Sequence, residues 1–89
     1  MKKKFLIKTK YGSFQAEIWF NGKEKVYFIK IPAFPGPMTE AQTLTEAKRY
    51  AGELIELEAL EALEHGKAII DDTRRVYSKS IQSGVVTLA

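Results

Sequence analysis

The chain has 89 residues, of which 45% are hydrophobic and 28% charged, and this balance with a net charge of +3 is typical of a single globular domain. It has no cysteine, which excludes disulfide frameworks and thiolate metal sites. No run reaches the roughly 20 apolar residues that span a bilayer. The apolar run Phe5–Ile7 ends at Lys8 and is too short to be the hydrophobic region of a signal peptide. We therefore expect one cytoplasmic domain over residues 1–89.

The first third of the chain has the pattern of β-strands. Apolar and polar side chains alternate along residues 4–10 and again along residues 14–20, as in strands with one buried face. The stretch Val26–Ile31 is rich in β-branched and aromatic residues, and Asn21 and Gly22 before it are residues that tolerate positive φ in a turn. The pattern therefore predicts a β-hairpin over Phe14–Ile31 with another strand before it.

A long helix is predicted after a loop that contains three prolines. Thr43 is a suitable N-cap, and Glu46 three residues later completes a capping box. The helix should run to about His65, with Gly66 as the residue after its C-terminus. Its apolar face should hold five residues, with Tyr50 and Leu57 at its edge: Leu44, Ala47, Ala51, Leu54 and Ile55.

The order of these elements predicts the fold class. Residues 67–75 read as a connector, and Val85–Leu88 reads as a short final strand that begins as early as Val76 in an alternative reading. The predicted class is α+β: a small antiparallel sheet of three to four strands with one long helix packed on one face, in the order β-β-β-α-β.

The charges are segregated along the chain. Residues 1–30 contain eight lysines and two glutamates, a balance of +6, whereas residues 31–64 contain seven glutamates against Lys48 and Arg49, a balance of −5. Residues 65–89 have a balance of +2. Each face of the domain should therefore attract a different kind of partner.

Residues 27–72 resemble the HicB family of antitoxins from toxin–antitoxin pairs, and the upstream hairpin extends the resemblance to about residue 14. An aromatic strand precedes a Pro-x-x-Pro-Gly turn, a threonine, a helix that opens Thr-Leu-x-Glu-Ala, and a glycine. The positions that carry these motifs are Pro32, Pro35, Gly36, Thr39, Thr43, Glu46 and Gly66. The resemblance implies a partial RNase H-like fold that binds and neutralises a small basic, mRNA-cleaving toxin of the HicA type.

Many members of that family carry a DNA-binding module after this domain. Residues 67–89 are too few for a helix-turn-helix and a poor fit to a ribbon-helix-helix. We therefore expect no separate DNA-binding domain and no operator binding by this chain alone.

The proline loop is interpreted as a rigid connection between strand and helix, with a partner-facing loop as the alternative.

The glutamates of the helix suggest a docking surface. On a wheel of 100° per residue, Glu53, Glu56 and Glu64 lie opposite the expected apolar face, and Leu60 and Leu63 lie among them. Exposed apolar groups rimmed by charge often mark interfaces, so these residues are the expected contact surface for a basic toxin. The alternative is a solvated face whose leucines pack on a second subunit or on the C-terminal segment.

The sequence contains no recognisable catalytic constellation. Asp71 and Asp72 with Glu17 match the residue types that hold two metals in RNase H enzymes, but a polar turn is the favoured interpretation. His65 and Glu61 are spaced for a weak metal site, whereas a cation at the helix C-terminus is the favoured interpretation. We therefore expect no enzyme activity, no metal and no cofactor.

Two rival functions stay open. The lysines of residues 1–30, with Tyr11, Trp19 and Tyr27, are suited to binding single-stranded nucleic acid, although lysines also protect an edge strand against aggregation. The other rival is an oligomeric structural domain without a toxin. The apolar strand Val85–Leu88 predicts a homo-oligomer in either case, and no membrane partner is expected.

Overall fold

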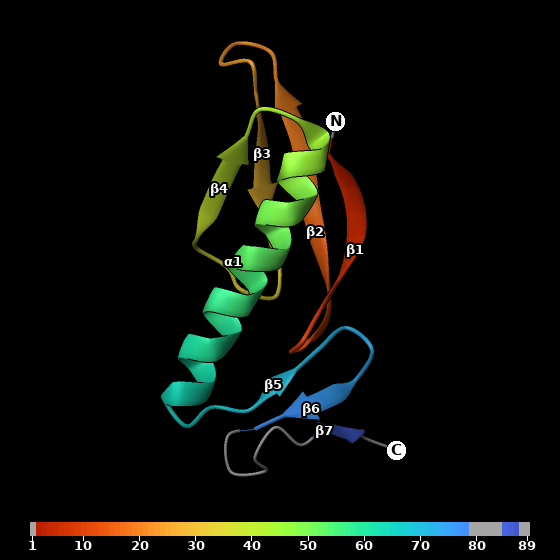
Figure 1. The fold of residues 1–89 in the computed structure, drawn as a ribbon, viewed down its shortest axis with the longest axis vertical. Coiled ribbons are helices and arrows are strands. Elements are labelled where there is room, and N and C mark those ends of the chain that lie inside the picture. Colours follow the sequence, from red (N-terminus) through yellow and green to blue (C-terminus); the bar gives the residue numbers. More distant parts are fainter. Residues whose placement is uncertain (1, 79–84, 88–89) are drawn as a thin grey trace.

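The computed structural model of the chain describes residues 2–78 and 85–87. Four strands form one antiparallel sheet in chain order: β1 (Lys3–Thr9), β2 (Gly12–Asn21), β3 (Val26–Lys30) and β4 (Met38–Ala41). The helix α1 (Leu44–Glu64) crosses one face of this sheet (Figure 1). A second antiparallel sheet contains β5 (Ile69–Ile70), β6 (Arg75–Tyr77) and β7 (Val85–Thr87).

The predicted α+β class is confirmed, with one helix packed on a four-stranded antiparallel sheet. Two strands form where the sequence predicts none: β4 lies in the expected loop before the helix, and β5 lies in the expected connector. The final strand β7 falls within the predicted Val85–Leu88, of which Leu88 lies outside the described residues, and it pairs with β6 rather than with the main sheet. Strands of two to four residues are too short to show a period of two, which explains these omissions.

The hairpin of β2 and β3 forms as predicted, but its turn differs in detail. Residues 22–25 make the loop between the paired ends of the two strands. The side-chain oxygen of Asn21 accepts hydrogen bonds from the amides of Lys23 and Glu24, each 3.0 Å long. The positive φ, 58°, falls on Lys25 and not on the glycine of this loop. The turn is therefore held by the asparagine side chain.

Local hydrogen bonds place both ends of α1 where they are predicted. Thr43 Oγ1 accepts from the Glu46 amide at 3.1 Å, and the Glu46 carboxylate accepts from the Gln42 amide at 3.3 Å. Gly66 has φ of 78°, and the amides of Gly66 and Lys67 donate to carbonyls of the last helical turn at 3.0 Å each, as in a Schellman motif. No helix among the described residues is long and apolar enough to cross a membrane.

The buried face of α1 is a row of residues spaced four apart. Its members are Ala47, Ala51, Ile55, Ala59 and Leu63. Alanine dominates this row, so the helix backbone can approach the sheet closely. Because an α-helix has 3.6 residues per turn, each step of four residues rotates the row by about 40°, and by Leu63 it has turned about 160° around the helix axis.

The prediction that Leu63 lies on the outward face of the helix is wrong, since its side chain is only 8% exposed and belongs to the core. A straight wheel assumes that one side of the helix stays buried along its whole length. Here the C-terminal part of α1 packs against β5, and Ile69 and Tyr77 from the second sheet join the core cluster. Leu44, which is also expected in the apolar face, is 37% exposed because it is not a member of the buried row, which begins at Ala47.

Leu63→Ala should lower the free energy of unfolding by about 2–4 kcal/mol, because it removes buried methyl groups and leaves a cavity. Leu60→Ala is the matched control: Leu60 is 43% exposed, and losing the same atoms there should change stability by about 0.5 kcal/mol or less. Urea unfolding of both variants measures the difference. Equal losses at the two positions would contradict the rotating buried row.

Candidate protein-binding groove

The helix row next to the buried row borders a groove. Its members are all half-buried and again spaced by four residues: Glu46, Tyr50, Leu54, Glu58 and Ala62. Residues of this row line three hollows, together with β4 and with the loop between β3 and β4. Half-buried side chains at the wall of a hollow leave their polar ends within reach of a bound molecule.

Two of the hollows lie between α1 and β4. The first has a volume of about 390 Å³, and Glu40, Glu46 and Tyr50 are among its walls. The second has a volume of about 300 Å³, shares Tyr50, and continues past Glu53 and Leu57. Tyr50 lines both, so the two hollows are neighbours along β4, the edge strand of the four-stranded sheet.

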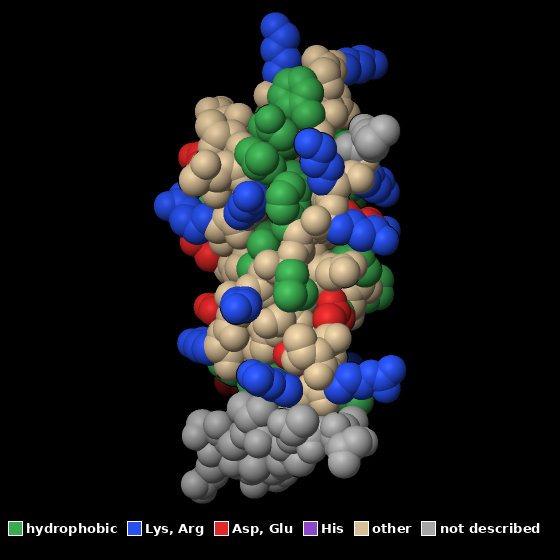
Figure 2. All heavy atoms as spheres, turned by 90° about the vertical axis from the view of Figure 1, so that its right-hand side faces the viewer, with side chains coloured by type: hydrophobic (Ala, Val, Ile, Leu, Met, Phe, Trp, Pro, Cys, Tyr) green, Lys and Arg blue, Asp and Glu red, His purple; other side chains and the backbone are tan. Residues whose placement is uncertain are grey.

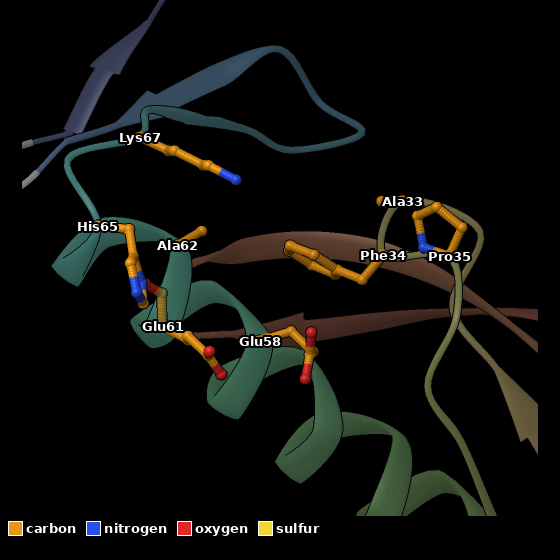
Figure 3. Close-up of a pocket in the computed structure, with 8 residues that line it drawn as sticks. All are labelled: Ala33, Phe34, Pro35, Glu58, Glu61, Ala62, His65 and Lys67. Atoms are coloured by element: carbon orange, nitrogen blue, oxygen red, sulfur yellow. The ribbon is translucent and has the colours of Figure 1, made fainter.

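The third hollow, of about 380 Å³, lies between the C-terminal half of α1 and the proline loop (Figure 3). Phe34 reaches from the loop toward the helix, and Lys67 extends over the same space from the segment after the helix (Figure 3). The helix contributes Glu58, Glu61, Ala62 and His65 to its walls. We call the three hollows together the acidic groove.

Most of the charged residues that line the acidic groove are glutamates. Its five glutamates are Glu40, Glu46, Glu53, Glu58 and Glu61. Lys67 is the one lysine or arginine among the lining residues. Leu57, also in the lining, is the most exposed large hydrophobic residue in the described part of the chain, at 61%. The groove therefore combines negative charge with an apolar contact.

The docking face predicted from the helical wheel is divided by the structure. Glu53 lines the acidic groove, but Glu56, Leu60 and Glu64 line none of these three hollows, and Glu56 lies on the flank of the helix that faces the end of β1. On that flank the Glu56 carboxylate is 3.5 Å from the Lys10 amide. A wheel with a fixed buried side cannot separate these flanks, whereas grouping the glutamates by steps of four would have separated them.

The loop motif of the resemblance forms one wall of the groove. Pro32, Pro35 and Gly36 are exposed, and the ring of Phe34 packs on the core residue Phe14 with 5.3 Å between centroids. Thr39 lies in β4 and lines the second hollow. The loop is thus anchored to the core through Phe34 and also lines the third hollow, and the partner-facing reading stays a prediction.

His65 is held by the helix end. Its Nδ1 lies 2.8 Å from the Glu61 carbonyl oxygen, so Nδ1 carries the hydrogen of that bond. No group of three or more histidine, aspartate or glutamate side chains among residues 2–78 and 85–87 is arranged to hold a metal ion. The geometry of His65 is that of a capping side chain at the groove wall.

The carboxylate of Asp71 accepts hydrogen bonds from main-chain groups of two segments. Its donors are the amides of Ser13 at 2.8 Å, Thr73 at 2.9 Å and Arg75 at 2.8 Å, and the Thr73 hydroxyl at 2.8 Å. The side chain is 4% exposed. Burial raises the pKa of the Asp71 carboxyl, but these hydrogen bonds together outweigh it and hold the pKa below its usual value.

Asp72 and Glu17 have separate structural contacts. Asp72 accepts from the Gln15 amide at 2.7 Å, and its own amide donates to the Ser13 carbonyl at 2.9 Å. Glu17 forms an ion pair of 4.0 Å with Lys2. The two aspartates therefore fasten the segment after the helix to the start of β2, as the polar-turn interpretation proposes.

No protein-family model, no curated protein and no solved structure matches this chain.

Asp71→Asn should lower the free energy of unfolding at neutral pH by about 1.5–3 kcal/mol, because an amide cannot accept all of these hydrogen bonds. The depressed pKa adds a pH dependence: the stabilisation by Asp71 is complete above the unfolded pKa of about 3.9 and is lost as pH falls through the lower folded pKa. Thermal unfolding between neutral pH and pH 2 measures both effects. The acid-induced loss should be smaller in Asp71→Asn than in the unaltered chain; identical profiles would contradict the network.

Proposed function

We propose that this chain is an antitoxin-like binding domain that captures a small basic protein along the acidic groove and blocks the action of that protein on RNA. The observation that carries the proposal is the set of four α1 glutamates that line the three hollows: Glu46, Glu53, Glu58 and Glu61. The sequence resemblance to HicB antitoxins supports the same reading, because it implies a basic, mRNA-cleaving toxin as the partner.

The charges of the groove act mainly on encounter and on partner choice. Exposed carboxylates such as Glu53 and Glu61 keep most of their hydration, so each adds little to the final affinity. Their summed field attracts a cationic protein and repels an anionic one. Leu57, exposed beside Glu53 in the same hollow, supplies the apolar anchor that slows dissociation.

Neutralisation follows from competition with RNA. A protein that cleaves mRNA binds a polyanion, so its working surface is basic. A groove lined with carboxylates presents negative charge to that basic surface, as RNA does. A protein held in the groove is therefore unable to bind RNA. Such inhibition is stoichiometric and requires no catalytic group and no cofactor from this chain. Because mRNA is translated in the cytoplasm, the proposed function also implies that the chain acts there.

Two further expectations belong to this proposal. Within residues 2–78 and 85–87, the outer strands β5 and β7 of the second sheet each have one edge without a strand partner, which favours self-association into a homo-oligomer. Operator DNA binding by the chain alone is not part of the proposal, since no helix follows α1 among the described residues to serve as a recognition helix.

The proposal predicts that an adjacent gene encodes a short basic protein. It is tested by co-expressing the chain with the product of that gene and purifying the complex. We expect the two proteins to co-purify and mRNA cleavage to stop in the complex. The double change Glu53→Lys and Glu61→Lys should weaken binding by about tenfold or more, because two attractions in the groove become repulsions.

The control is Glu56→Lys with Glu64→Lys, which changes the net charge equally on the other flank of the helix. Its affinity should stay within about threefold of the unaltered chain, since a rim charge away from the interface contributes little. Circular dichroism confirms that both variants fold. Failure to co-purify, or equal loss in the two double variants, would contradict the groove as the docking site.

A further inference from the structure

The outer face of the four-stranded sheet is open. The helix α1 lies on the inner face, where Phe14, Ala16 and Ile18 of β2 are buried, and no other helix is present in the described part of the chain (Figure 1). Because side chains alternate along a strand, Glu17 and Trp19 point to the outer face. Their partners on neighbouring strands share that face.

An aromatic pair occupies this outer face. Trp19 of β2 is directly opposite Phe28 of β3, with 5.8 Å between the ring centroids and 47° between the ring planes. The ammonium group of Lys2 lies 4.6 Å above the Trp19 ring, so that ring is accessible to a cation. A ring face that a flexible lysine can reach is also one on which a nucleobase can stack.

Lysines surround the aromatic pair. In the strand register Glu17 stands between Lys4 of β1 and Lys30 of β3, and it also lies 4.0 Å from Lys2. Glu40 of β4 is opposite Phe28 and shares this face, so two carboxylates are matched by three ammonium groups, which leaves one net positive charge beside the aromatic pair. Figure 2, which looks at the β1 edge of the sheet and not directly at its outer face, shows lysine and arginine side chains on both sides of a strip of hydrophobic side chains along this edge.

We propose that this outer face binds single-stranded nucleic acid, with bases stacked on Trp19 and Phe28 and phosphates held by Lys2, Lys4 and Lys30. Unpaired bases are required, because the bases of a duplex are stacked on each other and cannot lie on protein rings. The lysines disfavour a second copy of the chain on the same face, since like charges would meet. The site lies apart from the acidic groove and does not rest on the function proposed for that groove.

Trp19 is the only tryptophan of the chain, so its fluorescence reports this face alone. Single-stranded oligothymidylate and oligouridylate of about ten nucleotides should quench it, and a duplex of the same length should quench it far less. Three phosphate contacts predict a slope of about −2 for log affinity against log salt, which is a loss of roughly 20-fold between about 50 and 200 mM salt.

Variants separate this site from general attraction to a basic protein. Lys4→Gln with Lys30→Gln should reduce the salt slope by about 1.4, whereas the same charge change on the helix side of the molecule, Lys48→Gln with Lys67→Gln, should leave it unchanged. Phe28→Leu should weaken binding by about fivefold or more through lost stacking. The two lysine pairs decide the question even if Phe28→Leu unfolds.

Three outcomes would overturn the proposal. The first is no quenching of Trp19 by either oligonucleotide at about 50 mM salt, where backbone contacts are strongest. The second is an equal reduction of the slope in both lysine pairs, which would show unspecific attraction. The third is a Trp19 signal that changes with protein concentration alone, together with a dimer in light scattering, which would show that a second copy covers this face.

Discussion

The buried carboxylate of Asp71 is the contact on which the lower half of the molecule depends. It joins the amide of Ser13, at the start of β2, to the amides of its own turn, and so fastens the chain after α1 to the main sheet. Its place is available because residue 12 is glycine: Gly12 has φ of 109°, and a Cβ there would lie 2.5 Å from the Asp71 Cβ. With this segment fixed, Ile69 and Tyr77 reach the core and the last turns of α1 acquire a cover.

The cover determines which sides of the helix remain available to a partner. The buried row rotates around α1 as its packing passes from the main sheet to β5, and the neighbouring rows rotate with it. One of these rows therefore follows β4 and the proline loop along the whole helix and lines the acidic groove. Lys4 and Lys30 of the first strands lie on the sheet face that α1 does not cover, so part of the charge segregation of the sequence becomes a separation between faces of the fold.

The features that sequence reasoning predicts well are those set by local hydrogen bonds or by a long regular pattern. The ends of α1 are set by Thr43, Glu46 and Gly66, through hydrogen bonds between residues that are three to five positions apart in the chain. The β2–β3 hairpin shows a clear period of two. Leu63 is misplaced because a helical wheel does not contain the sheet that covers the C-terminal turns. Asp71 reads as a turn residue because the amide of Ser13, which it binds, lies 58 positions away in the chain. The wheel also does not predict that Glu58 and Glu61 line a groove, because the other wall of that groove is the proline loop, which the wheel does not contain.

We infer that the fold separates its charge into an acidic groove beside α1 and a basic outer sheet face. The most direct test is the residue-by-residue electrostatic potential, measured by NMR as paramagnetic relaxation caused by a cationic and an anionic probe of the same size. At moderate salt the potential decays within about 10 Å, so each amide reports its own face. The account predicts stronger relaxation by the cationic probe around Glu53, Leu57 and Glu61, and by the anionic probe around Lys4 and Lys30. Potentials of the same sign at both places would contradict it.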